Sequence, residues 1–85
     1  MAANAFDYTS MARKAEKAVR DEFPDAYVGT EKGYLGRVRL KVVSEEFRGM
    51  TEEQKQQIIW DILHEKMGSD SQSVSLALVY GPDEL

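Results

Sequence analysis

Apolar residues near the start of the chain recur at spacings of three and four, which is the spacing of one helix face. They are Tyr8, Met11, Ala12, Ala15, Ala18, Val19 and Phe23. We therefore expect a helix over residues 7–23, capped at its start by Asp7, Thr9 or Ser10. Pro24 ends it, because the residue before a proline disfavours the helical conformation. The charged residues of the opposite face then form a solvated surface.

The pattern changes to alternation in the segment DAYVGTEKGYLGRVRLKVVS. We expect strands over residues 26–32 and 37–43, joined by a turn at residues 33–36. Within the second strand, aliphatic residues alternate with cations: Val38, Leu40 and Val42 against Arg37, Arg39 and Lys41. Such alternation predicts a sheet with one packed face and one face in water.

The second half of the chain reads as a helix followed by a third strand. Ser44 can start a short helical turn, and Thr51 with Gln54 fits a capping box at the start of a longer helix. The apolar stripe of that helix is Ile58, Ile59, Ile62, Leu63 and Met67. Gly68 is a suitable C-cap. The apolar run at residues 74–80 then predicts a strand that ends at Gly81.

This order of elements predicts a two-layer α+β domain, α-β-β-α-α-β, with a three-stranded mixed sheet and both long helices on one face. The first two strands form a hairpin, and the third lies parallel to the second after a right-handed crossover. Residues 1–6 are expected to be a flexible tail and residues 7–85 a single domain. The expected core is Val19, Phe23, Val38, Leu40, Val42, Phe47, Ile58, Ile59, Ile62, Leu63, Leu76 and Leu78.

Composition narrows the class of function. The 85 residues are 42% hydrophobic and 31% charged, which is typical of a globular domain. One histidine, no cysteine and serines without a nearby base provide no catalytic triad and no thiolate metal site. We therefore expect no enzyme, no catalytic residue, no cofactor and no metal site. Neither a signal peptide nor a membrane span is evident, so we expect a cytoplasmic protein with no membrane partner.

Nucleic-acid binding remains an alternative because cations cluster locally. The candidate residues for binding phosphate are Arg37, Arg39, Lys41, Arg48 and Lys55. The other interpretation is a solvated sheet face neutralised by neighbours such as Glu31. The formal net charge of −4 opposes a polyanion, and no aromatic residue is interleaved with the cations, so we expect such binding to be weak.

Two further features have both a structural and a functional interpretation. The GYLG sequence at residues 33–36 spells the GxxG of KH domains, but KH domains place it between helices, whereas here it lies between expected strands as a turn. Trp60 lies off the isoleucine stripe of its helix. It either wraps around the edge of the core or anchors an interface.

Short motifs in the second half of the chain resemble the BolA family. That family's pattern runs through a strand, Val-x-Ser, two residues, Phe, x and Gly, then a helix opening with a basic-His-basic triplet, and ends in Thr-Pro-x-Glu. The matching residues are Val42, Ser44, Phe47, Gly49, Pro82 and Glu84. The triplet falls on Lys55-Gln56-Gln57, so Gln56 stands in place of the histidine. The histidine expected near the last strand falls on Ser73 or Ser75, and Gly81 replaces the threonine.

The resemblance implies a type II KH-like fold and a regulatory role, in the family linked to stress response, with monothiol glutaredoxins as partners. In those complexes a BolA histidine helps to bind an iron–sulfur cluster. An amide such as that of Gln56 is a poor iron ligand, and His64 lies about 12 Å further along the helix. We therefore expect a protein-interaction adaptor without cluster ligation. Its expected partner-binding residues are Arg48, Lys55, Gln56 and Trp60.

Overall fold

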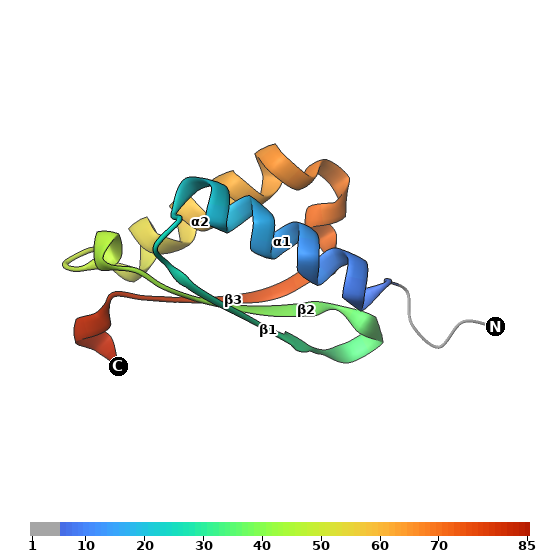
Figure 1. Ribbon diagram of the computed structural model, residues 1–85, viewed down its shortest axis with the longest axis horizontal. Helices are drawn as coiled ribbons and strands as arrows, with labels where there is room; N and C mark the ends of the chain where they lie inside the picture. Colours follow the sequence, from blue (N-terminus) through green and yellow to red (C-terminus); the bar gives the residue numbers. More distant parts are fainter. Residues whose placement is uncertain (1–5) are drawn as a thin grey trace.

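The computed structural model describes residues 6–85, which fold into one layer of helix over one layer of sheet (Figure 1). The helices and strands follow the chain as α1 (Tyr8–Glu22), β1 (Tyr27–Lys32), β2 (Val38–Val43), α2 (Glu52–Met67) and β3 (Val74–Tyr80). Short 3₁₀ turns lie between them, at Tyr34–Gly36, Glu45–Phe47 and Gly68–Ser73, and Pro82–Glu84 forms another after β3. The predicted α-β-β-α-α-β order is confirmed.

Both long helices begin at the caps that the sequence predicts. The Asp7 carboxylate accepts a hydrogen bond from the amide of Ser10 at 3.5 Å. At α2, the Thr51 hydroxyl accepts from the Gln54 amide at 3.1 Å, and the Gln54 side chain accepts from the Thr51 amide at 3.0 Å. This reciprocal pair satisfies two backbone donors that a helix start leaves unpaired. Gly68 closes α2 with a φ of 58°, a conformation that glycine adopts without strain.

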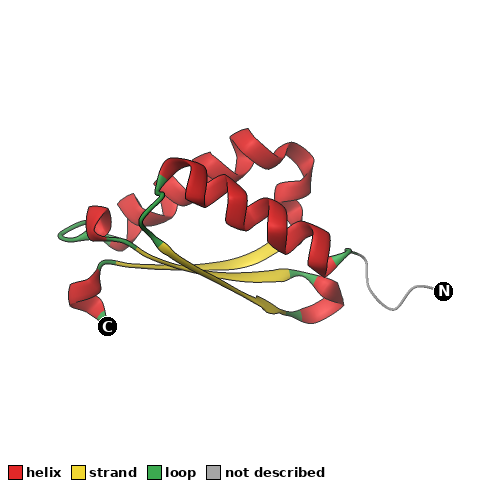
Figure 2. Ribbon diagram, in the orientation of Figure 1, coloured by secondary structure: helices red, strands yellow, loops and turns green. Residues whose placement is uncertain are grey.

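The sheet is mixed, with strand order β1-β2-β3. β1 pairs with β2 in antiparallel fashion, and β2 pairs with β3 in parallel. Both helices cover the same face, and the other face carries no helix (Figure 2). The predicted two-layer α+β architecture, with its hairpin and its helical crossover, is therefore confirmed.

The core lies between the helices and the covered face of the sheet. Seven predicted core residues are buried there: Val19, Val38, Leu40, Val42, Phe47, Ile59 and Leu63. Phe23, Ile58 and Ile62 pack against them but are only partly buried. The rest of the buried core is Ala12, Ala15 and Ala18 of α1, Met67 of α2, the strand residues Val28, Val74, Ala77 and Val79, and Ala26.

One part of the core prediction is wrong: Leu76 and Leu78 are each 39% exposed on the uncovered face. The cause is an extra residue in β3. Val74 pairs with Val38, but the next pair is Leu76 with Arg39, so Ser75 is bulged out of the ladder. Side chains alternate along a strand, so one inserted residue exchanges the two faces beyond it. Small residues, Ala77 and Val79, therefore face the helices.

The connections differ from the sequence expectation only in detail. The β1–β2 turn contains Leu35 at a φ of 58°, a left-handed conformation that is unusual for a leucine. Of the expected tail, residues 1–5 lie outside the described residues. Phe6 is described, and its amide donates to the Leu35 carbonyl at 3.3 Å. Within residues 6–85, no helix is long and apolar enough to cross a membrane.

Candidate interaction site

Lys55, a predicted partner-binding residue, lies in the first turn of α2 with a side chain that is only 1% exposed. Its Nζ donates to both carboxylate oxygens of Glu84 at 2.7 Å, and Glu52 lies 3.4 Å away. The hydrogen bond to Glu84 raises the pKa of Lys55, and Glu52 adds to the effect. The hydrogen bond from Lys55, joined by one from the Gly81 amide, lowers the pKa of Glu84. Lys55 is therefore a structural cation in this conformation.

The segment after β3 packs closely against the loop before α2. The Gly81 amide donates to Glu84 at 2.8 Å. A Cβ at Gly81 would lie 3.0 Å from backbone atoms of Arg48, so any side chain here would require that backbone to shift. Arg48 itself is exposed; it pairs with Glu45 at 3.0 Å and lies 4.0 Å from Asp83. Its hydrogen bond to Glu45 lowers the pKa of that carboxyl group and raises that of Arg48.

The Gln56 side chain is engaged at both ends. Its Nε2 donates to the Ala77 carbonyl of β3 at 2.8 Å and to Glu52 at 3.0 Å. Its Oε1 accepts from the indole N–H of Trp60 at 3.0 Å. Trp60 is partly buried against the core, and its ring centroid lies 5.8 Å from that of His64. Gln56 thus joins α2 to β3, and Trp60 holds the Gln56 side chain from the same helix.

These residues do not fit a ligand set for an iron–sulfur cluster. The Gln56 amide is a hydrogen-bond donor and acceptor whose donor and acceptor atoms both have protein partners. His64 is two helical turns further on, and its ring lies beside that of Trp60 in a tilted arrangement. Among residues 6–85, no group of three or more His, Cys, Asp or Glu side chains is placed to hold a metal ion. Iron prefers thiolate and imidazole ligands, which this position lacks.

The uncovered face of the sheet, here called the open face, forms three cross-strand rows. Register places Tyr27, Val43 and Tyr80 in one row, Gly29, Lys41 and Leu78 in the next, and Glu31, Arg39 and Leu76 in the third. The first row is apolar, the third carries an ion pair between Arg39 and Glu31 at 3.7 Å, and the middle row has a glycine where its neighbours carry side chains.

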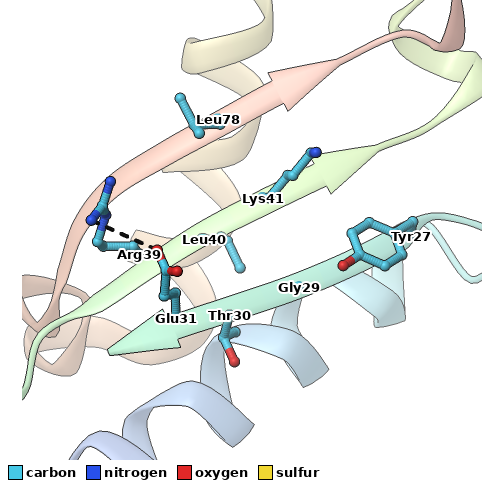
Figure 3. Close-up of a pocket in the computed structure, with 8 residues that line it drawn as sticks. All are labelled: Tyr27, Gly29, Thr30, Glu31, Arg39, Leu40, Lys41 and Leu78. Atoms are coloured by element: carbon cyan, nitrogen blue, oxygen red, sulfur yellow. Dashed lines mark ion pairs between the residues drawn. The ribbon is translucent and has the colours of Figure 1, made fainter. Parts of the chain in front are cut away.

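That missing side chain leaves a shallow hollow of about 240 Å³ beside Lys41 (Figure 3). The Tyr27 ring bounds it on one side, and Arg39 with Glu31 on the other. Leu78 lines it from β3, and the Lys41 ammonium projects from the central strand. Tyr27 is 59% exposed, so the open face presents a large aromatic group as well as its leucines to solvent.

A second, more open hollow of about 510 Å³ lies beside the predicted partner-binding residues of α2. Its lining is Met50, Glu53, Gln54, Gln57 and Ile58. Met50 and Ile58 are partly buried against the core. The charged residue of this lining is the acidic Glu53. The hollow on the open face is instead lined by two cations and one acid.

The five candidate cations for nucleic-acid binding do not form one patch. Arg39 and Lys41 are exposed on the open face. Arg37 is half-buried and lies over the Phe6 ring, 5.4 Å from its centroid. Arg48 is paired with Glu45, and Lys55 is buried beneath Glu84. The structure therefore separates the cations that the sequence groups together.

Two features of the site had only a weak signal in the sequence. Glu84 was matched to a family motif, but nothing in its position indicated that it would bind Lys55. The exposure of Leu76 and Leu78 follows from the bulge at Ser75, and the apolar run of residues 74–80 offered no marker for it.

The fold resembles that of a solved structure, BolA1 from Arabidopsis thaliana, with a TM-score of 0.67. The superposition covers 88% of this chain and 95% of that one, at 16% sequence identity. No family model matches the sequence, and no curated protein matches it. The chain therefore has a BolA-like fold.

Proposed function

We propose that this domain is a non-enzymatic adaptor that works by binding another protein. The observation that supports the proposal is the open face, where Tyr27, Leu76 and Leu78 are exposed beside Arg39 and Lys41. Apolar groups that gather on a surface and are bordered by charged residues are typical of protein-binding sites. Because no helix covers this face of the sheet, a partner can contact these exposed apolar residues together.

A monothiol glutaredoxin is the first partner to test, because that is the partner implied by the resemblance to the BolA family. Binding would not require Gln56 as a cluster ligand. The predicted partner-binding residues Arg48 and Trp60 remain accessible in part, whereas Lys55 and Gln56 would have to break internal contacts to reach a partner. The adaptor proposal therefore places the main contact on the open face.

The test is affinity capture from the protein's own cells, followed by binding of the purified candidates. Wild type is compared with a Lys41→Glu/Leu78→Glu double variant, which alters two exposed positions of the open face. Arg13→Glu on α1 is the charge control, because Arg13 is exposed on the helical layer. We expect a protein that wild type and the control retain and the double variant loses. Retention of the same proteins by all three would contradict the proposed surface.

Nucleic-acid binding is the second candidate, favoured by the exposed Arg39 and Lys41 on the same strand. Each neutralised phosphate releases counterions, so true phosphate binding must weaken steeply with salt. With two exposed cations, we expect a log–log slope of roughly −1.4 on single strands and an affinity no better than about 10⁻⁴ M at physiological salt. Fluorescence anisotropy at two salt concentrations measures both. Micromolar binding that an Arg39→Ala/Lys41→Ala variant loses would place this function first.

A further inference from the structure

We infer that the open face recognises an acidic segment of a protein partner, with one aliphatic side chain in the hollow beside Gly29 and a carboxylate at Lys41. This inference rests on the protein-binding function proposed above and adds the chemistry of the partner. Three features of the open face carry it: the hollow above Gly29, the state of Lys41, and the contrast between this face and the charge of the whole chain.

The hollow fits an aliphatic side chain. Gly29 forms its floor, and Tyr27 and Leu78 provide apolar walls. A Cβ at Gly29 would lie 2.6 Å from the Tyr27 hydroxyl oxygen, so the ring reaches over the glycine and narrows the hollow at one end. Removing an aliphatic group from water against such walls is favourable in proportion to the area buried. The two apolar walls, one aromatic ring and one leucine, suit a leucine-like group.

Lys41 supplies the charge that selects the partner. The Lys41 ammonium lies over the Tyr80 ring, 5.8 Å from its centroid. Within residues 6–85, no carboxylate lies within ion-pair distance of Lys41. The neighbouring Arg39 has Glu31 at 3.7 Å, a long contact whose carboxylate is 74% exposed. An exposed pair of this kind contributes little, so a partner carboxylate can replace it at small cost. Both cations are thus available beside the hollow.

The charge of the chain directs an acidic segment to this face. The whole chain carries −4, whereas Arg39 and Lys41 against Glu31 leave the open face at +1, since two cations meet one acid. A negatively charged segment is therefore attracted to the open face although the chain as a whole is acidic, which favours docking at this face. A basic segment would be repelled by the positive charge of the open face.

Isotope-edited NMR of the full chain tests the inference with defined peptides. The probe is the blocked peptide Glu-Glu-Leu-Glu-Leu-Glu-Glu. Its matched controls replace all glutamates by glutamine, all glutamates by lysine, or both leucines by serine. We expect saturable amide shifts at Gly29, Lys41 and Leu78 with the probe, and weaker binding with every control. Equal binding of the lysine peptide, or shifts confined to α2, would overturn the inference.

Protein variants locate the contact. Lys41→Glu should weaken the affinity for the probe peptide by about fivefold or more, since it replaces an attractive charge pair by a repulsive one. Gly29→Val fills the hollow with a residue that strands favour, and its Cβ displaces only the exposed end of the Tyr27 side chain, so it should abolish saturable binding while the protein stays folded. Arg13→Glu should leave the affinity within about twofold. Equal effects of Lys41→Glu and Arg13→Glu would mean that only net charge matters, which refutes the assigned contact.

The two proposals fail in different ways. If the probe does not bind but a purified protein binds at another surface, the inference is wrong and the adaptor function stands. If the probe binds the open face but no protein is captured, the recognition chemistry stands and the adaptor function loses its support. If a single-stranded oligonucleotide shifts the same amides and the probe does not, both are replaced by nucleic-acid binding.

Discussion

The Nζ atom of Lys55 lies 2.7 Å from both carboxylate oxygens of Glu84, and this contact joins the first turn of α2 to the turn after β3. Both residues match the motifs of the BolA family, at opposite ends of the second half of the chain. Their pairing gives the two motif positions a shared structural role. It also means that the basic residue of the triplet is not presented to solvent in this conformation.

The Lys55–Glu84 contact should make stability depend on pH at the acid end. The pKa of Glu84 is lowered from 4.5 in the folded protein, so its stabilisation is complete above pH 4.5 and is lost as pH falls through the lowered value. The raised pKa of Lys55 acts in the opposite sense: its stabilisation is present below pH 10.5 and is lost as pH rises through the folded value.

Urea unfolding at several pH values measures this effect by comparing wild type with Glu84→Gln. The variant should be less stable at neutral pH, and the difference in the free energy of unfolding should shrink as pH falls from 4.5 through the lowered pKa of Glu84. Asp83→Asn is the matched control in the same turn, because it also removes one carboxylate charge at constant size, and Asp83 is exposed and lies 4.0 Å from Arg48. If the difference in the free energy of unfolding between wild type and Glu84→Gln stays constant down to the lowest pH, the charge of the Glu84 carboxylate does not stabilise the fold.

Gly81 should not tolerate a side chain. Gly81→Thr restores the residue of the family pattern, but its Cβ would lie 3.0 Å from the Arg48 backbone, which cannot move as a side chain can. We expect a loss of about 1–3 kcal/mol in the free energy of unfolding, as for other overpacked sites. Gly33→Ala is the control, since its Cβ would meet the flexible Arg39 side chain at 3.2 Å. Similar losses at both positions would contradict the explanation.

Leucines of the core and of the open face should respond differently to truncation. Leu63 is fully buried, so Leu63→Ala should destabilise by about 2–5 kcal/mol through the cavity that it leaves. Leu78 is 39% exposed, and Leu78→Ala should cost less than about 1 kcal/mol. Chemical denaturation of both variants gives the comparison. A large loss at Leu78 would indicate that β3 has the register of an unbulged strand.

Gln56→His tests the chemistry of the family position. The substitution places an imidazole where the resemblance to the BolA family implies a histidine, but one ring cannot replace the Gln56 bonds to Ala77, Glu52 and Trp60 together. We expect a modest loss of stability and, with a cluster-loaded monothiol glutaredoxin, a change in the visible spectrum that wild type does not produce. His64→Gln in wild type should leave the spectrum unchanged. A cluster signal in wild type that depends on His64 would reverse this prediction.

The sequence was a good guide where a pattern is local. Helix caps at Asp7 and Thr51, and the alternation of β2, predicted the elements and the covered face of the sheet, because each depends on residues close in the chain. The contacts of Lys55 and Gln56 could not be predicted in this way. They join segments more than 20 residues apart, so their partners become evident only when α2 lies beside β3.

The error at Leu76 and Leu78 has a different origin. Periodicity identifies the two faces of a strand but not which one meets the core, and the run of residues 74–80 is apolar on both. A regular ladder would have turned the leucines inward. The prediction failed because a bulge depends on how β3 pairs with β2, and hydrophobicity along one strand carries no record of that pairing.

The bulge at Ser75 also bears on how such a surface can arise in evolution. Since Leu76 and Leu78 face solvent only because β3 contains one residue more than its partner, loss of a single codon would turn both leucines towards the helices and bring Ala77 and Val79 outward. A related chain without that residue would present a smaller, smoother sheet surface from an almost unchanged sequence. Counting residues between Gly68 and Gly81, rather than comparing their identities, would then distinguish relatives that share this surface from those that do not.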